Sequence, residues 1–254
     1  FYASGDMGAG QFGNRDRPQR AQIPGSYEGK ILRFNLEADG DAGLAAWIPN
    51  SNPYSATSAV YAIGIRNNQG FAYDPDLNIL YGSSHGPYSD DEINIIQRRR
   101  NYGHPIIIGY NDGNYNGTTT PSTNTSLSAG AAFTDNSGNS ACPPVGNEAT
   151  NKTTIDANGN GLYKDPLFSA YPETNAAIRT IWQTNPGNGA WPSEGWSGLD
   201  LYTNTLIPGW KKSLVATSLK WGRLVRIKLG TSGTITVPSN DPINNAGDTI
   251  SYFG

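Results

Sequence analysis

The sequence predicts an all-β protein with long surface loops, and three observations support this fold class. Glycine and proline are abundant, with 31 and 17 of the 254 residues, and they mark turns between short segments. Aromatic residues, which favour strands, make up 11% of the chain. No segment carries a long apolar stripe with the period of a helix.

The expected strands are short segments in which apolar and polar residues alternate, or in which apolar residues run together. Gly, Pro, Asn and Asp separate them, which is typical of antiparallel strands joined by turns. One such turn is Asp74-Pro75-Asp76. The expected strands cover residues 30–36, 59–65, 71–73, 79–82, 92–97, 213–218, 224–229 and 234–237.

The succession of strands and turns is typical of propeller blades, each of about 40–50 residues. Residues 113–165 interrupt it, because they are rich in Asn, Thr, Ser and Gly and poor in apolar residues. We expect a long loop insertion there. The remaining residues, roughly 200, correspond to four to five blades at that repeat length.

Charge and hydropathy exclude some classes of partner. Lys and Arg number 18 against 21 Asp and Glu, a net charge of −3, so no basic field attracts nucleic acid. The dense basic run Arg98–Arg100 is expected to be a solvated loop. No apolar run reaches the roughly 20 residues that span a bilayer. Asn- and Thr-rich loops with little Lys resemble secreted proteins and suggest a periplasmic or extracellular location.

Two phrases carry polar residues at positions suited to a site. Residues 3–11 contain glycines that permit a tight turn, from which Asp6 and Gln11 could project into one site. Taken alone, the phrase is a β-turn capped by Asp. Arg66 and Asn67 end an apolar strand, and the planar donor fork of Arg suits a carboxylate or a polarised carbonyl. The alternative for Arg66 is an exposed turn residue.

Two further phrases suit a metal ion and an anion. Gly86-Pro87 places backbone carbonyls at a bend beside the acids at 90–92, and Asp112 follows; hard oxygens of this kind suit Ca²⁺. The alternative is an exposed acidic turn. Lys220 stands at a strand end, either to meet an anionic ligand or as a solvated residue. Residues 156–161 fit half of a calcium-binding loop, although position 12 is Leu167, which favours an Asn/Gly-rich turn.

Six phrases occur in order between Ser4 and Leu229: SGDxGxxQ, GKILRxNL, GxRNxQG, HGPxSDDEIN, NYGxP and SLKxGxLxRIKL. Together they resemble the soluble glucose/aldose (glucose–sorbosone) dehydrogenase family. The resemblance implies a six-bladed β-propeller that binds pyrroloquinoline quinone (PQQ) and Ca²⁺. The family's catalytic His precedes the first phrase and its Arg pair follows the last strand. Residues 1–254 are therefore expected to be the central part of the propeller, inactive without the remaining propeller segments.

The resemblance also implies roles for individual residues. Arg66 would lie against the reactive carbonyl of the quinone, Asn67 and Lys220 would contact its oxygens and carboxylates, and Asp6 would orient the catalytic His. Gln11 would lie near the sugar, and Trp191 and Ser193 would line the pocket. Gly86 and Pro87 would hold the Ca²⁺ that bridges the quinone. Structural calcium sites would use Glu92, Tyr102 and Asp112 with the carbonyls of Ile108 and Tyr110.

The implied activity is oxidation of an aldose at C1 by hydride transfer to PQQ, with an electron acceptor that the sequence does not identify. A second hypothesis is a non-catalytic, calcium-stabilised propeller that binds carbohydrate or protein. Of the two histidines, His85 is expected to support the calcium site and His104 to be a loop residue.

Overall fold

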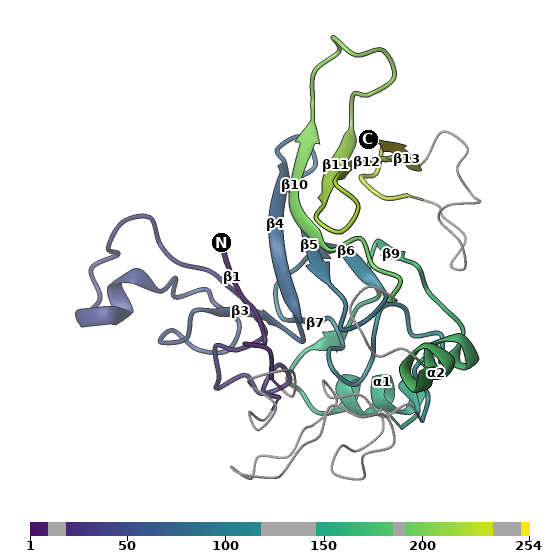
Figure 1. Ribbon diagram of the computed structural model, residues 1–254. Helices are drawn as coiled ribbons and strands as arrows, with labels where there is room; N and C mark the ends of the chain where they lie inside the picture. The colour runs from purple at the N-terminus through teal and green to yellow at the C-terminus, as the bar shows by residue number, and fades with distance from the viewer. Residues whose placement is uncertain (10–18, 118–145, 185–190, 236–249) are drawn as a thin grey trace.

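The computed structural model describes residues 1–9, 19–117, 146–184, 191–235 and 250–254 (Figure 1). Strands dominate these residues and form three sheets. The N-terminal sheet has the order β1-β2-β3-β7-β8, the central sheet β4-β5-β6-β9 and the C-terminal sheet β10-β11-β12-β13. The prediction of a mostly β protein is therefore confirmed.

The N-terminal sheet combines two kinds of pairing. Strands β1, β2 and β3 are antiparallel neighbours, whereas β7 pairs with β3, and β8 with β7, in parallel. The strands are β1 Tyr2–Ser4, β2 Lys30–Leu32, β3 Val60–Ile63, β7 Arg100–Asn101 and β8 Leu162–Tyr163.

The other two sheets are four-stranded and wholly antiparallel. The central sheet contains β4 Asn67–Asp74, β5 Ile79–His85, β6 Asp91–Ile96 and β9 Phe168–Ala170. The C-terminal sheet contains β10 Trp196–Tyr202, β11 Ser213–Ser218, β12 Arg223–Lys228 and β13 Ile250–Phe253. Four antiparallel strands in sequential order are the pattern of a propeller blade.

The first strands of the central and C-terminal sheets, β4 and β10, lie side by side (Figure 1). Glycine permits this approach, because a Cβ on Gly70 would lie 2.4 Å from the backbone nitrogen of Leu199. An apolar core fills the space between the two sheets, and its largest side chains include Tyr81, Phe168 and Trp196. An ion pair of Lys212 with the buried Asp74, at 2.6 Å, also joins them.

The structure corrects several expectations. Three sheets, not four to five blades, are present among the described residues, and they do not close into a ring. Two α-helices occur in the described ranges, α1 Glu148–Ala157 and α2 Asn175–Thr184, so the expected loop insertion 113–165 ends in a helix and strand β8. Of the expected strand 234–237, the described residues Thr234 and Ile235 are not in a strand, and the rest lies outside the described ranges.

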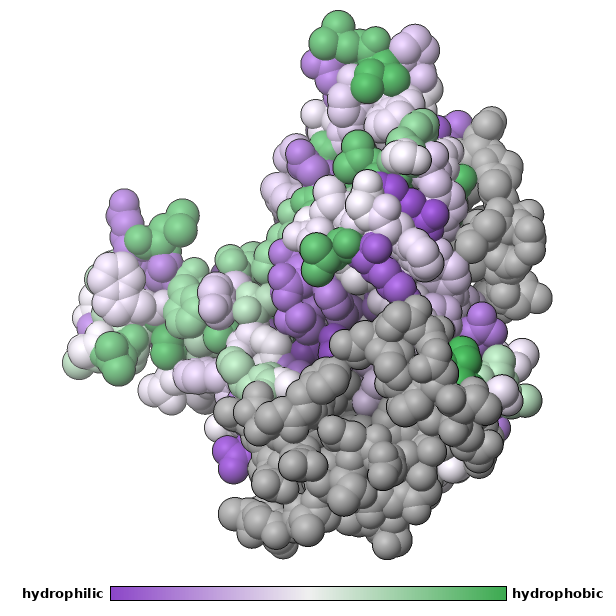
Figure 2. Space-filling view, viewed as in Figure 1, coloured by the Kyte–Doolittle hydropathy of each residue, from purple (hydrophilic) through white to green (hydrophobic). Residues whose placement is uncertain are grey.

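Between β2 and β3 the chain makes a projecting arm that includes the 3₁₀ helix Gly43–Trp47 (Figure 1). Apolar side chains are exposed on the arm, among them Leu36 and Leu44 at 99% and 85% (Figure 2). None of the helices in the described ranges is long and apolar enough to cross a bilayer.

Candidate functional site

The candidate site lies at one end of the central and C-terminal sheets, where some strands begin and their neighbours end; this end is called the site edge. In an antiparallel sheet, the start of one strand lies beside the end of the next. Asn67 begins β4 and pairs with His85, which ends β5, and Asp91 begins β6. Trp196 begins β10 and pairs with Ser218, which ends β11. Residues from distant parts of the sequence therefore gather at this edge.

Arg66 and Asn67 enter the site from the start of β4. The amide of Asp6 donates to the carbonyl of Arg66 at 2.8 Å, and the amide of Asn67 donates to Ser84 Oγ at 3.2 Å. The positive charge of Arg66 acts on the neighbouring His85, whose pKa is lowered first by burial and further by this charge, against the opposing charge of Asp91.

Gly86 stands at a bend that admits no side chain. A Cβ there would lie 1.7 Å from the carbonyl oxygen of Ser89. The backbone at Asp90 is left-handed, with φ of 59°, which closes the turn. The amide of Gly86 donates to Asp91 Oδ1 at 2.7 Å, so the bend is fixed to the first residue of β6.

Asp91 joins this bend to a segment about a hundred residues further along the chain. Its Oδ2 accepts hydrogen bonds from Ser193 Oγ at 2.7 Å and from the amides of Glu194 and Gly195, both at 2.6 Å. The residue is fully buried. One carboxylate thus holds both segments in place, which the sequence did not predict for Asp91 in particular.

Lys220 reaches the same place from the end of β11. Its amide donates to the carbonyl of Glu194 at 3.1 Å, and its ammonium group donates to the carbonyl of Trp191. A Cβ on Gly195 would lie 3.6 Å from the backbone nitrogen of Lys220 and 3.8 Å from the ring of His85. The backbones at Gly195 and Lys220 and the ring of His85 are therefore neighbours.

The structure thus places Arg66, Asn67, Gly86 and Lys220 near one another, at the same end of the two sheets. Ser193 belongs to the same cluster through Asp91. Trp191 is buried, and its ring packs against Tyr88 with centroids 4.4 Å apart. Pro87 is also buried. Gln11 lies outside the described residues.

Asp6 and His104 form a buried pair. His104 lies in a turn, as expected, and the structure adds that its side chain is buried against Asp6. Their side chains are 4% and 5% exposed, and Asp6 Oδ2 lies 3.0 Å from His104 Nε2. Gln19 Nε2 donates to the same carboxylate oxygen at 2.9 Å. Burial would raise the pKa of Asp6, but the interactions with His104 and Arg66 outweigh it and lower that pKa. Burial lowers the pKa of His104, an effect that Asp6 opposes.

A second group of acids lies around the loop that follows β7. Glu92 Oε1 accepts from the amide of Gly109 at 3.2 Å, and Glu148 at the start of α1 accepts from the amides of Ile108 and Gly113 at 3.1 and 2.7 Å. Burial raises the pKa of Glu92 to about 8 and that of Glu148 to about 7. Burial also raises the pKa of Asp112, which in turn adds to the shift of Glu148.

The other residues expected at calcium lie in the same region, but with side chains engaged elsewhere. The hydroxyl of Tyr102 donates to the carbonyl of Ile95 at 2.6 Å, and that of Tyr110 accepts from the amide of Ser169 at 3.2 Å. Only their backbone oxygens remain as donors to a metal. Among the described residues, no three His, Cys, Asp or Glu side chains are arranged around one point to hold a metal ion.

Two functional candidates were missed by the sequence. Glu148 was placed in a loop insertion, yet its carboxylate is fully buried beside the loop of Asp112. The missed signal was Asn147, whose side chain accepts from the amide of Thr150 and starts α1. Gly195 was missed because a lone glycine gives no indication of which segments it brings together.

Comparison with known proteins identifies the family to which the chain belongs. The model of the family described as glucose/sorbosone dehydrogenase matches residues 4–153, more than half of the chain. The chain therefore belongs to the glucose/sorbosone dehydrogenase family.

Individual relatives agree with this result. The chain is 30% identical over 271 residues to quinoprotein glucose dehydrogenase B of Acinetobacter calcoaceticus, a match that covers 96% of this chain and 51% of that protein. It is 37% identical over 97 residues to aldose sugar dehydrogenase YliI of Escherichia coli, over 37% of this chain and 24% of that protein. A solved glucose dehydrogenase shares the fold, with a TM-score of 0.53 and 19% identity, over 97% of this chain and 51% of that one. The chain thus spans about half the length of quinoprotein glucose dehydrogenase B.

Proposed function

We propose that this chain holds the cofactor of a PQQ- and Ca²⁺-dependent sugar dehydrogenase, which oxidises an aldose at C1 by hydride transfer. The observation that carries the proposal is the convergence of Arg66-Asn67, the Gly86 bend and Lys220 at the site edge, held by Asp91 and Gly195. Family membership supports it. The three sheets would be consecutive blades of a six-bladed propeller, of which the chain is the central part.

The residues present fit such a cofactor in kind. A guanidinium and an ammonium group suit a flat quinone that carries carboxylates, since both are strong donors to anionic oxygens. The Gly86-Pro87 bend presents backbone oxygens, which Ca²⁺ accepts as ligands, and a side chain at Gly86 would block the bend. When bound, PQQ supplies the two-electron redox chemistry.

The chain's own residues would bind, orient and handle charge. Arg66, Asn67 and Lys220 would hold the cofactor, and the charge of Arg66 would stabilise negative charge that develops next to it. Asp6 would orient the imidazole of the catalytic His that precedes the first family phrase, and this imidazole would accept the sugar hydroxyl proton. In the structure, Asp6 Oδ2 lies 3.0 Å from Nε2 of a different histidine, His104. Gln11, Trp191 and Ser193 would shape the sugar pocket, with Ser193 fixed by Asp91.

A second calcium site would stabilise the loop after β7. Glu92 and Asp112 would supply carboxylates, with backbone oxygens of Tyr102, Ile108 and Tyr110. Glu148 would support this loop without binding the ion, since its two oxygens accept from the amides of Ile108 and Gly113. The largest influences on the pKa values of the three acids are burial, backbone and amide donors and neighbouring carboxylates, with no Lys or Arg among them. A bound hard cation would favour the ionised carboxylates and so lower these raised pKa values.

The test reconstitutes the protein together with the remaining propeller segments, adds PQQ and Ca²⁺, and measures reduction of an artificial acceptor with a panel of aldoses. Lys220→Ala should lower kcat/KM at least about 100-fold, because a charged hydrogen-bond donor to the cofactor is lost. Lys228→Gln, an exposed residue of β12, is the matched control. If no aldose is oxidised and no quinone absorbance survives desalting, the enzyme hypothesis is wrong; sugar binding without oxidation would then support the binding-module hypothesis. Periplasmic or extracellular secretion is part of the proposal and is tested by cell fractionation.

A further inference from the structure

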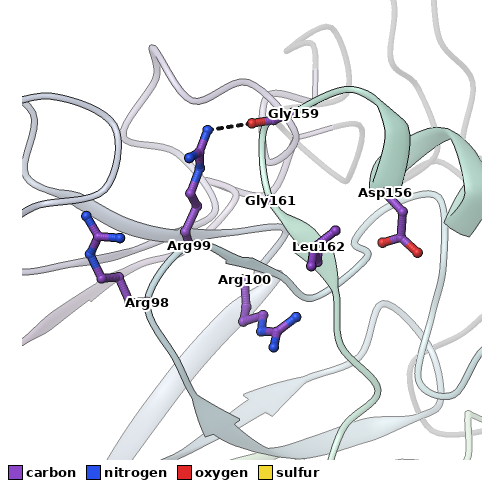
Figure 3. A pocket seen from close by; sticks show the side chains of 7 residues that line it. All are labelled: Arg98, Arg99, Arg100, Asp156, Gly159, Gly161 and Leu162. Carbon is purple, nitrogen blue, oxygen red and sulfur yellow. Dashed lines mark hydrogen bonds between the residues drawn. The ribbon is translucent and has the colours of Figure 1, made fainter.

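A cavity lined by charged residues and glycines lies at the other end of β6, away from the proposed cofactor site. From Asp91 to Ile96 the strand spans about 17 Å. The cavity, of about 400 Å³, is lined by Arg98–Arg100 on one wall and by Asp156, Gly159, Gly161 and Leu162 on the other (Figure 3). Its size falls within the range of small-molecule sites.

The arginine wall is a tight turn with an unusual residue at its tip. Arg99 has a left-handed backbone with φ of 58°, a conformation in which glycine is the least strained residue. The turn is nevertheless held in place, since the amide of Arg99 donates to the carbonyl of Tyr61 at 2.8 Å. A strained arginine that the fold supports in this way points to a role for its side chain.

The opposite wall is fixed against the arginine turn. The guanidinium of Arg99 donates to the carbonyl of Gly159 at 2.8 Å (Figure 3), and the hydroxyl of Tyr54 donates to the carbonyl of Asn160 at 2.5 Å. A Cβ on Gly161 would lie 2.8 Å from the carbonyl oxygen of Arg99, so glycine permits this close approach. The two walls therefore form one preorganised site.

The cavity has an excess of hydrogen-bond donors on the arginine wall. Each guanidinium carries five N–H groups. Arg98 uses Nε to donate to the carbonyl of Ser51 at 3.1 Å, and Arg99 donates to Gly159. Within the part of the chain that the structure describes, the Arg100 guanidinium makes no side-chain hydrogen bond or ion pair, although its charge helps to lower the pKa of Asp156. Planar forks of this kind match a carboxylate.

The facing wall adds acceptors. Asp156 pairs with Lys152 and accepts from the amide of Tyr163 at 2.8 Å, and the carbonyl of Gly159, which lines the same wall, accepts from Arg99. A bare phosphate would meet the negative charge of Asp156. A ligand with a carboxylate at one end and hydroxyl groups at the other would satisfy both walls.

We propose that this arginine cavity binds an acidic carbohydrate, with Arg100 on the carboxylate of a uronic-acid unit and Asp156 accepting its hydroxyls, while Arg99 holds the facing wall through the Gly159 carbonyl. None of these residues belongs to the proposed cofactor site, so the inference stands independently of the proposed function.

The test is calorimetric titration of the full chain, without PQQ, at low salt. The probes are methyl glucuronoside, methyl glucoside and inorganic phosphate; the methyl glycosides have no free C1 hydroxyl to serve as dehydrogenase substrates. We expect saturable binding of the glucuronoside in the millimolar range and at least tenfold weaker binding of the other two. Arg100→Gln should weaken glucuronoside binding at least about tenfold, because it removes the charged donor to the carboxylate.

Two controls separate recognition from charge and folding. Lys228→Gln removes the same charge from an exposed position on β12 and should leave binding unchanged. Asp156→Asn should lower the ratio of glucuronoside affinity to phosphate affinity at least about fivefold, because it removes the negative charge that repels phosphate. The proposal is wrong if the glucuronoside does not saturate by about 20 mM, if phosphate binds as tightly, or if Arg100→Gln and Lys228→Gln act alike.

Discussion

Asp91→Asn tests the arrangement on which the proposed cofactor site depends. The carboxylate accepts four hydrogen bonds, one from Gly86 on Oδ1 and three from residues 193–195 on Oδ2. An asparagine keeps one oxygen, which the three donors would take. Its NH₂ group would then face the amide of Gly86, so one charge-assisted bond is lost and one buried N–H is left unpaired.

The magnitude follows from these two losses. A hydrogen bond to a charged group contributes about 1.5–3 kcal/mol, and an unsatisfied buried donor costs about 1–3 kcal/mol. We therefore expect Asp91→Asn to lower the free energy of unfolding by about 3–5 kcal/mol, or Tm by roughly 10 °C for a chain of this size. The same bend would loosen, so affinity for PQQ should fall as well.

Urea unfolding of the full chain, followed by intrinsic fluorescence, measures the stability change, and quinone absorbance measures cofactor retention. Asp200→Asn is the matched control, because Asp200 is exposed on β10 and accepts only from the adjacent amide of Leu201. It should change stability by less than about 0.5 kcal/mol. If Asp91→Asn stays within about 1 kcal/mol of the unchanged protein, then Asp91 does not hold the site together.

Three further predictions concern stability. Burial would raise the pKa of Asp74, but the interaction with Lys212 outweighs burial and lowers that pKa. The pair therefore stabilises the fold fully at pH values above the pKa of an unfolded Asp, about 3.9. This stabilisation is lost as the pH falls through the lower pKa of the folded state. Asp74→Asn should cost about 1–3 kcal/mol at pH 7 and flatten the loss of stability below about pH 4 in urea titrations; parallel curves would contradict this. Gly86→Ala should destabilise by at least about 3 kcal/mol, because its Cβ would clash with Ser89, whereas Gly25→Ala, with open space around it, should be nearly neutral; equal effects would refute the steric argument. Chelation of Ca²⁺ should lower Tm by removing about 2.7 kcal/mol at a hundredfold excess over Kd, and Glu92→Gln should reduce this shift; an unchanged melt removes the calcium assignment.

The strands that the sequence predicted are those with local hydrophobic patterns. β11 spans the expected residues 213–218, and β12 differs from the expected strand by one residue at each end. β10 was missed because Gly198, which packs against β4, and a register shift between Trp196 and Gly198 interrupt its alternation. Helix α1 was missed because only Glu148 and Ile155 are buried, so its sequence is as polar as a loop.

Helix α2 had a signal that was overlooked. Thr174 Oγ1 accepts from the amide of Ala177 at 3.2 Å, which is the pattern of an N-cap, and Ile178 and Ile181 follow with helical spacing. Both isoleucines pack with Trp191. Local signals therefore indicated this helix, whereas the position that it takes against Trp191 depends on contacts that only the folded chain shows.

The site was predictable to the extent that its residues occupy strand ends, because antiparallel pairing brings alternate starts and ends to one edge. Which ends share an edge is decided by packing between sheets, through Gly70 against Leu199 and through Asp91 with residues 193–195. The same cause explains the pairing of Asp6 with His104, 98 residues apart, which no local pattern indicates. A binding site assembled in this way depends on a few buried polar contacts that join sheets, so substitutions at Asp91 should disturb cofactor binding as much as substitutions at Lys220, although only Lys220 would contact the cofactor.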